Sequence, residues 1–361
     1  MHWRCSMAPR FSSARSPVTE FSVVAAVCGP PNATHASHGF GGHKPPLQMK
    51  RILVIRGGAI GDFILTLPAL KLLRDAFPNA RVEIVGYKHI AALAENQFYA
   101  DAVRSLEDGR LAGFFAADAE LDREWSNYFG SFDLIVSYLF DPDTIFQRNL
   151  NRCGVENFVA CSPKIFGDEH AAVQLARPLE QLGLVVTDAP AKLYPSVTDR
   201  DLAKKDYAGG AAIAIHPGSG SLSKSWPLEH WIALLDRLLM HRMDPSLLVI
   251  GGEADTEQLT TLRSALSGRA RFIENLALVS LAAVLERCVL FIGHDSGISH
   301  MAAAVGTQCI LLFGPTDPRV WAPANANVRV VQSCTGAMRG ISVDEVAEAV
   351  HAAGAIDELT S

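Results

Sequence analysis

Residues 51–62 read RILVIRGGAIGD, an apolar run that ends in a glycine-rich turn followed by an aspartate. The run Arg51–Arg56 is short and rich in β-branched residues, which is typical of a buried strand. Beyond it, apolar residues between Phe63 and Leu73 recur at spacings of one, three and four, which gives a helix one apolar stripe. A strand, a tight turn and a helix in this order predict an α/β domain that begins near Met49.

The alternation of strand and helix continues along the chain and starts again after Gly209-Gly210. Strands separated by helices of this length indicate parallel βαβ units. We therefore predict an α/β fold with two Rossmann-like domains, at 49–195 and 196–361, whose ligands bind outside the carboxyl ends of the strands. The predicted strands are 51–56, 81–85, 132–138, 211–216, 247–250, 289–292 and 308–313, and the predicted helices after the first are 169–184, 227–240, 254–266, 298–304 and 343–352.

The composition excludes several classes of protein. The 361 residues are 49% hydrophobic and 19% charged, which is typical of a globular chain. No run approaches the roughly 20 apolar residues of a membrane-spanning helix, so a polytopic membrane protein is excluded. A net charge of −6 argues against a protein that binds nucleic acid by bulk electrostatics. The seven cysteines are scattered and form no CxxC pair, which favours a reducing compartment.

Residues 1–48 differ from the rest of the chain. They contain six prolines, four histidines and a single acidic residue, Glu20. Several arginines with few acids would suit a targeting peptide, but the cleavage signal is poor. We expect a disordered extension or a start codon assigned too early, because Met49-Lys50-Arg51 leads directly into the first strand.

The turn at 57–62 places Asp62 in the first turn of the following helix. An aspartate there either caps the helix and complements its dipole, or acts as a catalytic group at the carboxyl edge of the sheet. The spacing G-G-x-x-G-D is not the dinucleotide motif G-x-G-x-x-G, and an acid at this point would repel a pyrophosphate. Both features count against a nicotinamide-dependent oxidoreductase.

A second loop, residues 216–226, reads HPGSGSLSKSW. The backbone amides of a glycine-serine loop, its hydroxyl groups and Lys224 ahead of a helix make an anion site suited to a diphosphate. The alternative is a flexible surface loop, which explains the glycines and serines but not the apolar Trp226-Pro227 that follows.

Two further loops follow strands of the second half. Glu253 stands after Gly251-Gly252, where an acid can accept both hydroxyls of a ribose, and an N-cap role is the alternative. Residues 293–300, GHDSGISH, bring polar side chains and free amides to one sheet edge. Ser296 lacks the G-x-S-x-G context of a nucleophile elbow, and His300 taken alone would be an ordinary helix histidine.

In this order, the four loops resemble glycosyltransferase family 9, the ADP-heptose:lipopolysaccharide heptosyltransferases. The resemblance runs from Met49 to about residue 355, and its most specific part is DSGISHMAAA at 295–304, followed by FGPTD at 313–317 and WAP at 321–323. Gly61-Asp62 with Pro68, and KSWP at 224–227, match as well. The resemblance implies the GT-B fold, in which two Rossmann-like domains face a cleft.

The resemblance also implies roles for individual residues. Asp62 corresponds to the catalytic base and His300 to the family histidine. The donor-binding positions fall on Ser219 and Lys224 at the diphosphate, Glu253 at the ribose, Val279 near the base pocket, Asp295 at the donor sugar, and Ser296 and Gly297 at the phosphates.

By the same resemblance, the chain is expected to be an inverting, metal-independent glycosyltransferase that needs no cofactor. It would move a sugar, with heptose as the expected one, from an ADP-heptose-like donor to a lipopolysaccharide core or related glycan or glycolipid. Domain 49–195 would bind the acceptor and domain 196–361 the nucleotide sugar. The enzyme would be cytoplasmic, with peripheral contact to the inner membrane surface and no nucleic-acid partner. The alternative is a non-catalytic sugar-nucleotide-binding protein, which needs no base at Asp62.

The chain departs from the family pattern on the acceptor side. Family members usually continue the strand after Phe132 into a short Asp-x-Gln-Gly segment that faces the acceptor. This chain has Ser137, Leu139 and Phe140 there, followed by Asp141-Pro142-Asp143. The tripeptide has the D-x-D spacing that binds a metal in another class of glycosyltransferases, but it is also ordinary turn chemistry. We interpret it as a turn and predict no metal ligands.

Overall fold

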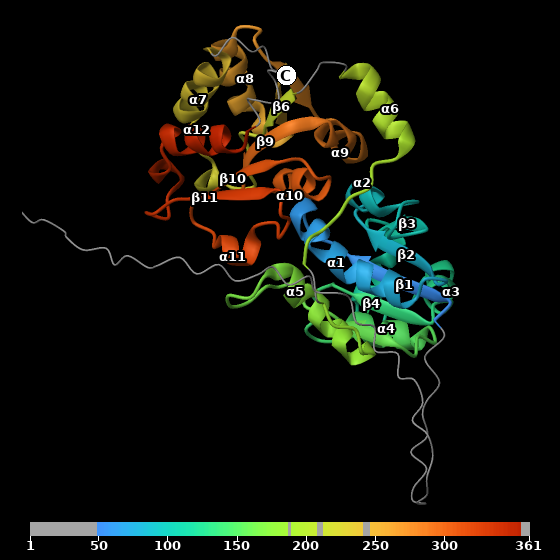
Figure 1. Ribbon diagram of the computed structural model, residues 1–361. Coiled ribbons are helices and arrows are strands. Elements are labelled where there is room, and N and C mark those ends of the chain that lie inside the picture. Colours follow the sequence, from blue (N-terminus) through green and yellow to red (C-terminus); the bar gives the residue numbers. More distant parts are fainter. Residues whose placement is uncertain (1–48, 187–188, 208–211, 241–245, 355–361) are drawn as a thin grey trace, which may run out of the picture. The chain divides into compact units, whose positions relative to one another are not determined.

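The computed structural model describes residues 49–186, 189–207, 212–240 and 246–354 (Figure 1). The expectation for residues 1–48 lies outside the described residues. Within the described ranges, the strands form two parallel sheets, and no helix is both long and apolar enough to cross a membrane.

The first sheet has the strand order β3-β2-β1-β4-β5, so the order reverses between β1 and β4. Strand β1 occupies the predicted residues, and each strand pairs in parallel with its neighbours. The strands are Arg51–Arg56 (β1), Arg81–Gly86 (β2), Ala102–Ser105 (β3), Leu134–Ser137 (β4) and Phe158–Ala160 (β5).

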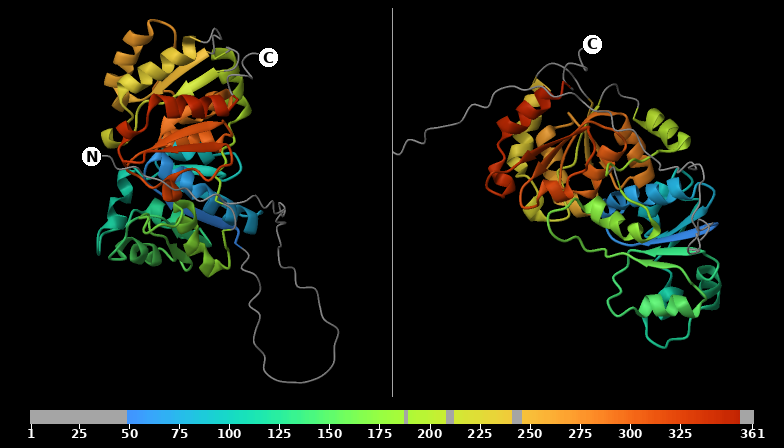
Figure 2. Two further views of the ribbon diagram at one scale, coloured as in Figure 1. Left: turned by 60° about the vertical axis from the view of Figure 1, so that its left-hand side comes forward. Right: turned by 60° about the horizontal axis from the view of Figure 1, so that its bottom comes forward.

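Both faces of the first sheet are covered, because alternate residues of β1 enter different clusters of buried side chains. Ile52 and Val54 pack in the cluster that contains the buried face of α1, whereas Leu53 and Ile55 pack with the aromatic residues of α3 and α4. In the right-hand view of Figure 2, helices lie on both sides of the blue and green strands of this sheet. The helices of this half are Ile60–Ala76 (α1), Lys88–Ala91 (α2), Ala92–Ala94 (η1), Gly109–Phe115 (η2), Arg123–Phe129 (α3), Ile145–Arg152 (α4), Ala171–Ala176 (α5) and Arg177–Leu182 (η3).

The single helix predicted at 169–184 is wrong in extent. The structure has a short α-helix, α5, that begins at Ala171 and passes into the 3₁₀ turn η3 at Arg177. Pro178 explains the change, because proline lacks the amide hydrogen with which the α-helix would continue.

The second sheet repeats the arrangement with one more strand, in the order β11-β10-β9-β6-β7-β8, and its order reverses between β6 and β9. The strands are Ala212–Ile215 (β6), Ser246–Gly251 (β7), Arg271–Glu274 (β8), Cys288–His294 (β9), Cys309–Phe313 (β10) and Val328–Gln332 (β11).

Helices cover both faces of the second sheet as well. Ile213 and Ile215 pack with α7, α8 and α12, whereas Ala212 and Ala214 pack with α9 and α10 on the other face (Figure 1). The helices of this half are Val197–Asp206 (α6), Leu222–Lys224 (η4), Leu228–Met240 (α7), Glu253–Asp255 (η5), Thr256–Leu266 (α8), Leu278–Glu286 (α9), Gly297–Ala304 (α10), Pro318–Trp321 (α11), Met338–Gly340 (η6) and Val343–Ala352 (α12).

The two halves share one cluster of buried side chains, which includes Phe63 and Leu67 of α1 together with Met301 of α10. Helices α1 and α10 pack directly on each other. The predicted α/β fold with two Rossmann-like sheets is confirmed, and the contact between α1 and α10 brings together two of the loops expected to carry chemistry.

Candidate active site

The carboxyl ends of β6 and β9 lie side by side where the strand order of the second sheet reverses. Ligands bind in the crevice at such a switch point in open α/β sheets. The loop after β6 begins at His216, and Asp295 and Ser296 follow β9. Ser296 Oγ lies 3.3 Å from His216 Nδ1, so the fold joins two predicted loops at one point.

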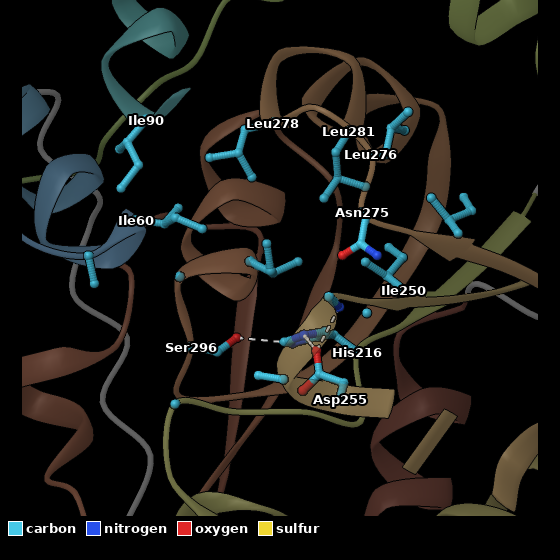
Figure 3. A pocket seen from close by; sticks show the side chains of 18 of the residues that line it. Ile60, Ile90, His216, Ile250, Asp255, Asn275, Leu276, Leu278, Leu281 and Ser296 are labelled. Atoms are coloured by element: carbon cyan, nitrogen blue, oxygen red, sulfur yellow. Dashed lines mark hydrogen bonds and ion pairs between the residues drawn. The ribbon is translucent and has the colours of Figure 1, made fainter. Parts of the chain in front are cut away.

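A cavity of about 560 Å³ opens at this edge of the sheet. Figure 3 shows His216, Asp255 and Ser296 together at one end, while the other end is lined mostly by apolar side chains, with Asn275 among them. The apolar end consists of Ile250, Ile273, Leu276, Leu278 and Leu281. Its size is that of a small-molecule site, and the two ends suit a ligand with a flat apolar ring at one end and polar groups at the other.

Asp255 is a carboxylate in this cavity that the sequence analysis did not single out. Its Oδ2 accepts the amide hydrogen of Gly252 at 2.8 Å and lies 3.5 Å from His216 Nε2. Burial acts to raise the pKa of Asp255, but the hydrogen bonds from His216 and Gly252 outweigh it and lower the pKa. Glu253, the acid expected at the ribose, is exposed and does not line the cavity. The available signal was the position of Asp255 three residues after Gly252, which is capping-box spacing.

Lys224 and Asp295 form an ion pair beside the polar end of the cavity. The Lys224 Nζ and Asp295 Oδ2 atoms are 2.7 Å apart, and the side chains are 31% and 10% exposed. Ser219 lines the cavity, and its hydroxyl donates to the Ser221 carbonyl at 2.5 Å. Because Lys224 is already paired with Asp295, a diphosphate bound at this end would share the Lys224 ammonium group with the Asp295 carboxylate.

Asp62 is the third residue of α1, and its two carboxylate oxygens have different surroundings. Oδ2 accepts the amide hydrogen of Ala59 at 2.9 Å, whereas Oδ1 lies 3.9 Å from Arg56 Nη2. The side chain is 40% exposed. Asp62 thus caps its helix with one oxygen while its side chain stays partly exposed, so the capping role and a catalytic role are geometrically compatible.

The buried side chain of Arg56 holds the backbone at Asp62 through hydrogen bonds. Its Nη2 donates to the Asp62 carbonyl at 3.1 Å, and its Nε donates to Thr66 Oγ1 at 2.9 Å. The Thr66 hydroxyl in turn donates to the same carbonyl at 2.8 Å. Burial lowers the pKa of Arg56, and the neighbouring Asp62 carboxylate works against this effect. No motif in the sequence indicates this role for Arg56, which ends a strand of mostly apolar residues.

His300 lies where α10 meets the start of α1. A Cβ atom placed on Gly61 would lie 3.4 Å from His300 Cδ2. Burial lowers the pKa of His300 to about 4, although the charges of Asp295 and Asp62 act to raise it. At neutral pH His300 is therefore an uncharged imidazole, which can donate or accept a hydrogen bond but does not neutralise either carboxylate.

Gly297 allows the N-termini of α1 and α10 to approach closely. A Cβ atom on Gly297 would lie 2.6 Å from Ile60 Cβ and 2.9 Å from the Gly61 nitrogen. We expect Gly297→Ala to destabilise the protein by about 1–3 kcal/mol through overpacking, seen as a lower Tm in thermal denaturation. Gly109→Ala is the matched control, since a Cβ there meets nothing within 4 Å. Equal Tm values for the two variants would contradict the close contact.

Val279 lies apart from the main cavity. Although it belongs to the first turn of α9, it lines a separate cavity of about 20 Å³ with Tyr194 and Ala282. Its neighbours Leu278 and Leu281 line the main cavity instead. Of the predicted site residues, Ser219, Ser296 and Gly297 line the main cavity. Asp62, Lys224, Asp295 and His300 lie next to these residues without lining it, and Glu253 and Val279 lie outside it as well.

Asp141 has the geometry of a turn and helix-capping residue. Its two carboxylate oxygens accept the amide hydrogens of Phe146 at 3.2 Å and Gln147 at 3.0 Å, at the start of α4. Across residues 49–354, apart from the undescribed gaps, no group of three or more His, Cys, Asp or Glu side chains is arranged to hold a metal ion.

Comparisons with known proteins extend these observations. The profile of glycosyltransferase family 9 (heptosyltransferase) matches residues 171–351. The chain is 26% identical to lipopolysaccharide heptosyltransferase 3 from Escherichia coli over 308 residues, 74% of this chain and 84% of the relative. A solved glycosyl transferase family 9 protein from Veillonella parvula is similar with a TM-score of 0.71 and 20% identity, covering 87% and 99% of the two chains. The E. coli heptosyltransferase WaaC, solved with ADP, gives a TM-score of 0.63 at 18% identity, covering 84% of this chain and 99% of that one.

Proposed function

The chain belongs to glycosyltransferase family 9 and is a glycosyltransferase of the GT-B fold, and from this we propose that it transfers a heptose from an ADP-heptose-like donor to the lipopolysaccharide core or a related glycan. The names of its relatives support the sugar and the acceptor, and the ADP bound to the similar E. coli structure supports the nucleotide. We further propose that domain 49–195 binds the acceptor, that domain 196–361 binds the donor, and that the enzyme works in the cytoplasm at the inner membrane surface.

The observation that carries the proposal is the make-up of the main cavity. Ser296 and Gly297 line it from the start of α10, while Ala59 and Ile60 line it from the start of α1. A nucleoside whose base occupies the apolar end would place its diphosphate near Ser219 and Ser296. The attached sugar would then extend toward the first turn of α1, which carries Asp62.

In the mechanism that we propose, the acceptor hydroxyl attacks the anomeric carbon in a single displacement. Asp62 takes the hydroxyl proton, the new glycosidic bond forms as the bond to the diphosphate breaks, and the anomeric configuration inverts. Lys224 and the amides at the start of α10 stabilise the negative charge that develops on the departing diphosphate, which is the role a metal ion plays elsewhere. The ionised carboxylate of Asp255 in the cavity would accept hydrogen bonds from the ribose hydroxyls.

A transfer and hydrolysis screen with purified protein tests this function. The panel contains ADP-heptose, ADP-glucose, UDP-glucose and GDP-mannose, each incubated with and without deep-rough lipopolysaccharide as acceptor. We expect ADP release from ADP-heptose, faster with acceptor, and unchanged rates in the presence of EDTA, because Lys224 supplies the positive charge. No turnover of any ADP-sugar would contradict the donor assignment. Loss of activity in EDTA with recovery in Mg²⁺ or Mn²⁺ would contradict metal independence.

A further inference from the structure

A second cavity, of about 230 Å³, lies in the first half of the chain. It opens at the carboxyl ends of β4 and β5. Its walls come from the loop after β4, the start of α4 and the loop after β5. The lining residues are Ser137, Leu139, Phe140, Asp141, Pro142, Thr144, Gln147, Phe158, Ala160, Cys161, Ser162 and Pro163.

The walls of this cavity combine aromatic rings with small polar groups. Phe140 is 61% exposed, and the Lys164 Nζ atom lies 4.1 Å from the centroid of its ring, a contact that helps to hold the ring in place. Ser137, Thr144 and Gln147 line the same cavity and contribute hydroxyl and amide side chains to it. A pyranose ring has this same combination, with apolar C–H faces and a rim of hydroxyls.

The Asp141 carboxylate has a different task in the same loop. Both of its oxygens already accept amide hydrogens at the start of α4. These hydrogen bonds tie Asp141, which lies between Phe140 and Pro142, to the start of α4. The loop is therefore held in a defined shape, so Phe140 presents its ring from a fixed position.

A short path of contacts connects the cavity to the proposed base. Ser137 pairs with Ile55 across the sheet, so the residues that follow them, Tyr138 and Arg56, lie at the carboxyl ends of two neighbouring strands. The Arg56 guanidinium lies 5.6 Å from the centroid of the Tyr138 ring and 3.9 Å from Asp62 Oδ1. Ser137, which lines the cavity, thus directly precedes Tyr138, whose ring contacts the arginine that holds Asp62.

We propose that this cavity binds a pyranose ring of the acceptor glycan and that Phe140 is the specificity-determining residue on which this ring stacks. The inference rests on the proposed function, and it assigns acceptor recognition in this chain to residues that the family pattern does not contain.

Saturation-transfer NMR on the full chain tests the proposal with named sugars. The probes are the methyl pyranosides of glucose, galactose and mannose together with glucuronate, and myo-inositol serves as a hydroxylated ring without a pyranose oxygen. We expect at least one pyranose to bind the wild type, with the strongest transfer to the C–H protons of one face. In Phe140→Ala its Kd should rise by about tenfold, and Phe140→Trp should restore binding because it keeps an aromatic face.

Phe166→Ala is the matched control. Phe166 is 69% exposed near Lys164 in the sequence but does not line the cavity, so its loss should leave sugar binding unchanged. The proposal is overturned if no sugar of the panel binds the wild type, if Phe140→Ala binds as well as the wild type, or if Phe166→Ala weakens binding equally. ADP titrated into the same samples separates this inference from the proposed function. Failure of the wild type to bind ADP would contradict the donor site. Normal ADP binding, together with sugar binding that is unchanged in Phe140→Ala, would contradict the role of Phe140 alone.

Discussion

Replacing Asp62 by asparagine is expected to lower kcat by about 100-fold or more, while the affinity for ADP stays close to that of the wild type. The asparagine oxygen can still accept the Ala59 amide hydrogen, so the first turn of α1 is preserved. The amide cannot take a proton from the acceptor hydroxyl at neutral pH. Arg56 loses the carboxylate 3.9 Å from its Nη2, so a small fall in Tm is expected as well. The measurements are steady-state transfer, ADP calorimetry and thermal denaturation.

Asp122→Asn is the matched control for this prediction. Asp122 caps α3, where its side chain accepts the Trp125 amide hydrogen at 2.9 Å, and it lines neither of the two larger cavities. A variant that changes only a cap should keep the wild-type kcat. Transfer by Asp62→Asn within about threefold of the wild-type rate would reduce Asp62 to a capping residue. The base of the reaction would then have to be sought among other groups near the cavity.

The central strands could be predicted from the sequence because they are buried on both faces. Every residue of β10 is buried, and every residue of β1 except Arg51 is buried. The sequence shows this as an apolar run in each strand. The four strands that the sequence analysis did not identify, β3, β5, β8 and β11, are the edge strands of the two sheets. In β3 and β11 no residue is fully buried, so these segments have neither a continuous apolar run nor a clear alternation.

The loops of the candidate site could also be predicted, but not every side chain that faces the cavity. Asp255 and Glu253 stand two residues apart after the same strand, and only the 3₁₀ turn there turns Asp255 inward. At the start of α9, a shift of one residue rotates a side chain by about 100°, which separates Val279 from Leu278. Such differences depend on how the helix packs, and the packing partners come from distant parts of the chain.

Lys224→Met is expected to weaken ADP binding by about 10- to 100-fold, since a hydrogen bond to a charged group contributes roughly 1.5–3 kcal/mol. Methionine keeps the length and apolar character of the side chain and removes only the charge. The loss has two sources, because the ammonium no longer attracts the diphosphate and the Asp295 carboxylate, 2.7 Å from it in the wild type, is left unpaired beside the same anion. Lys204→Met, on the exposed surface of α6, is the control and should bind ADP normally.

Combining Lys224→Met with Asp295→Asn separates these two sources. If Lys224 served only to neutralise Asp295, then removing the lysine charge would have no effect once residue 295 is neutral. If the ammonium contacts the diphosphate, as we propose, then Lys224→Met should still weaken ADP binding by about fivefold or more in the Asp295→Asn background. Calorimetry with ADP on the wild type, the two single variants and the double variant gives the coupling free energy between the two side chains directly. ADP affinity that is unchanged by Lys224→Met in both backgrounds would remove Lys224 from the donor site and leave the charge of the departing diphosphate to the amides at the start of α10.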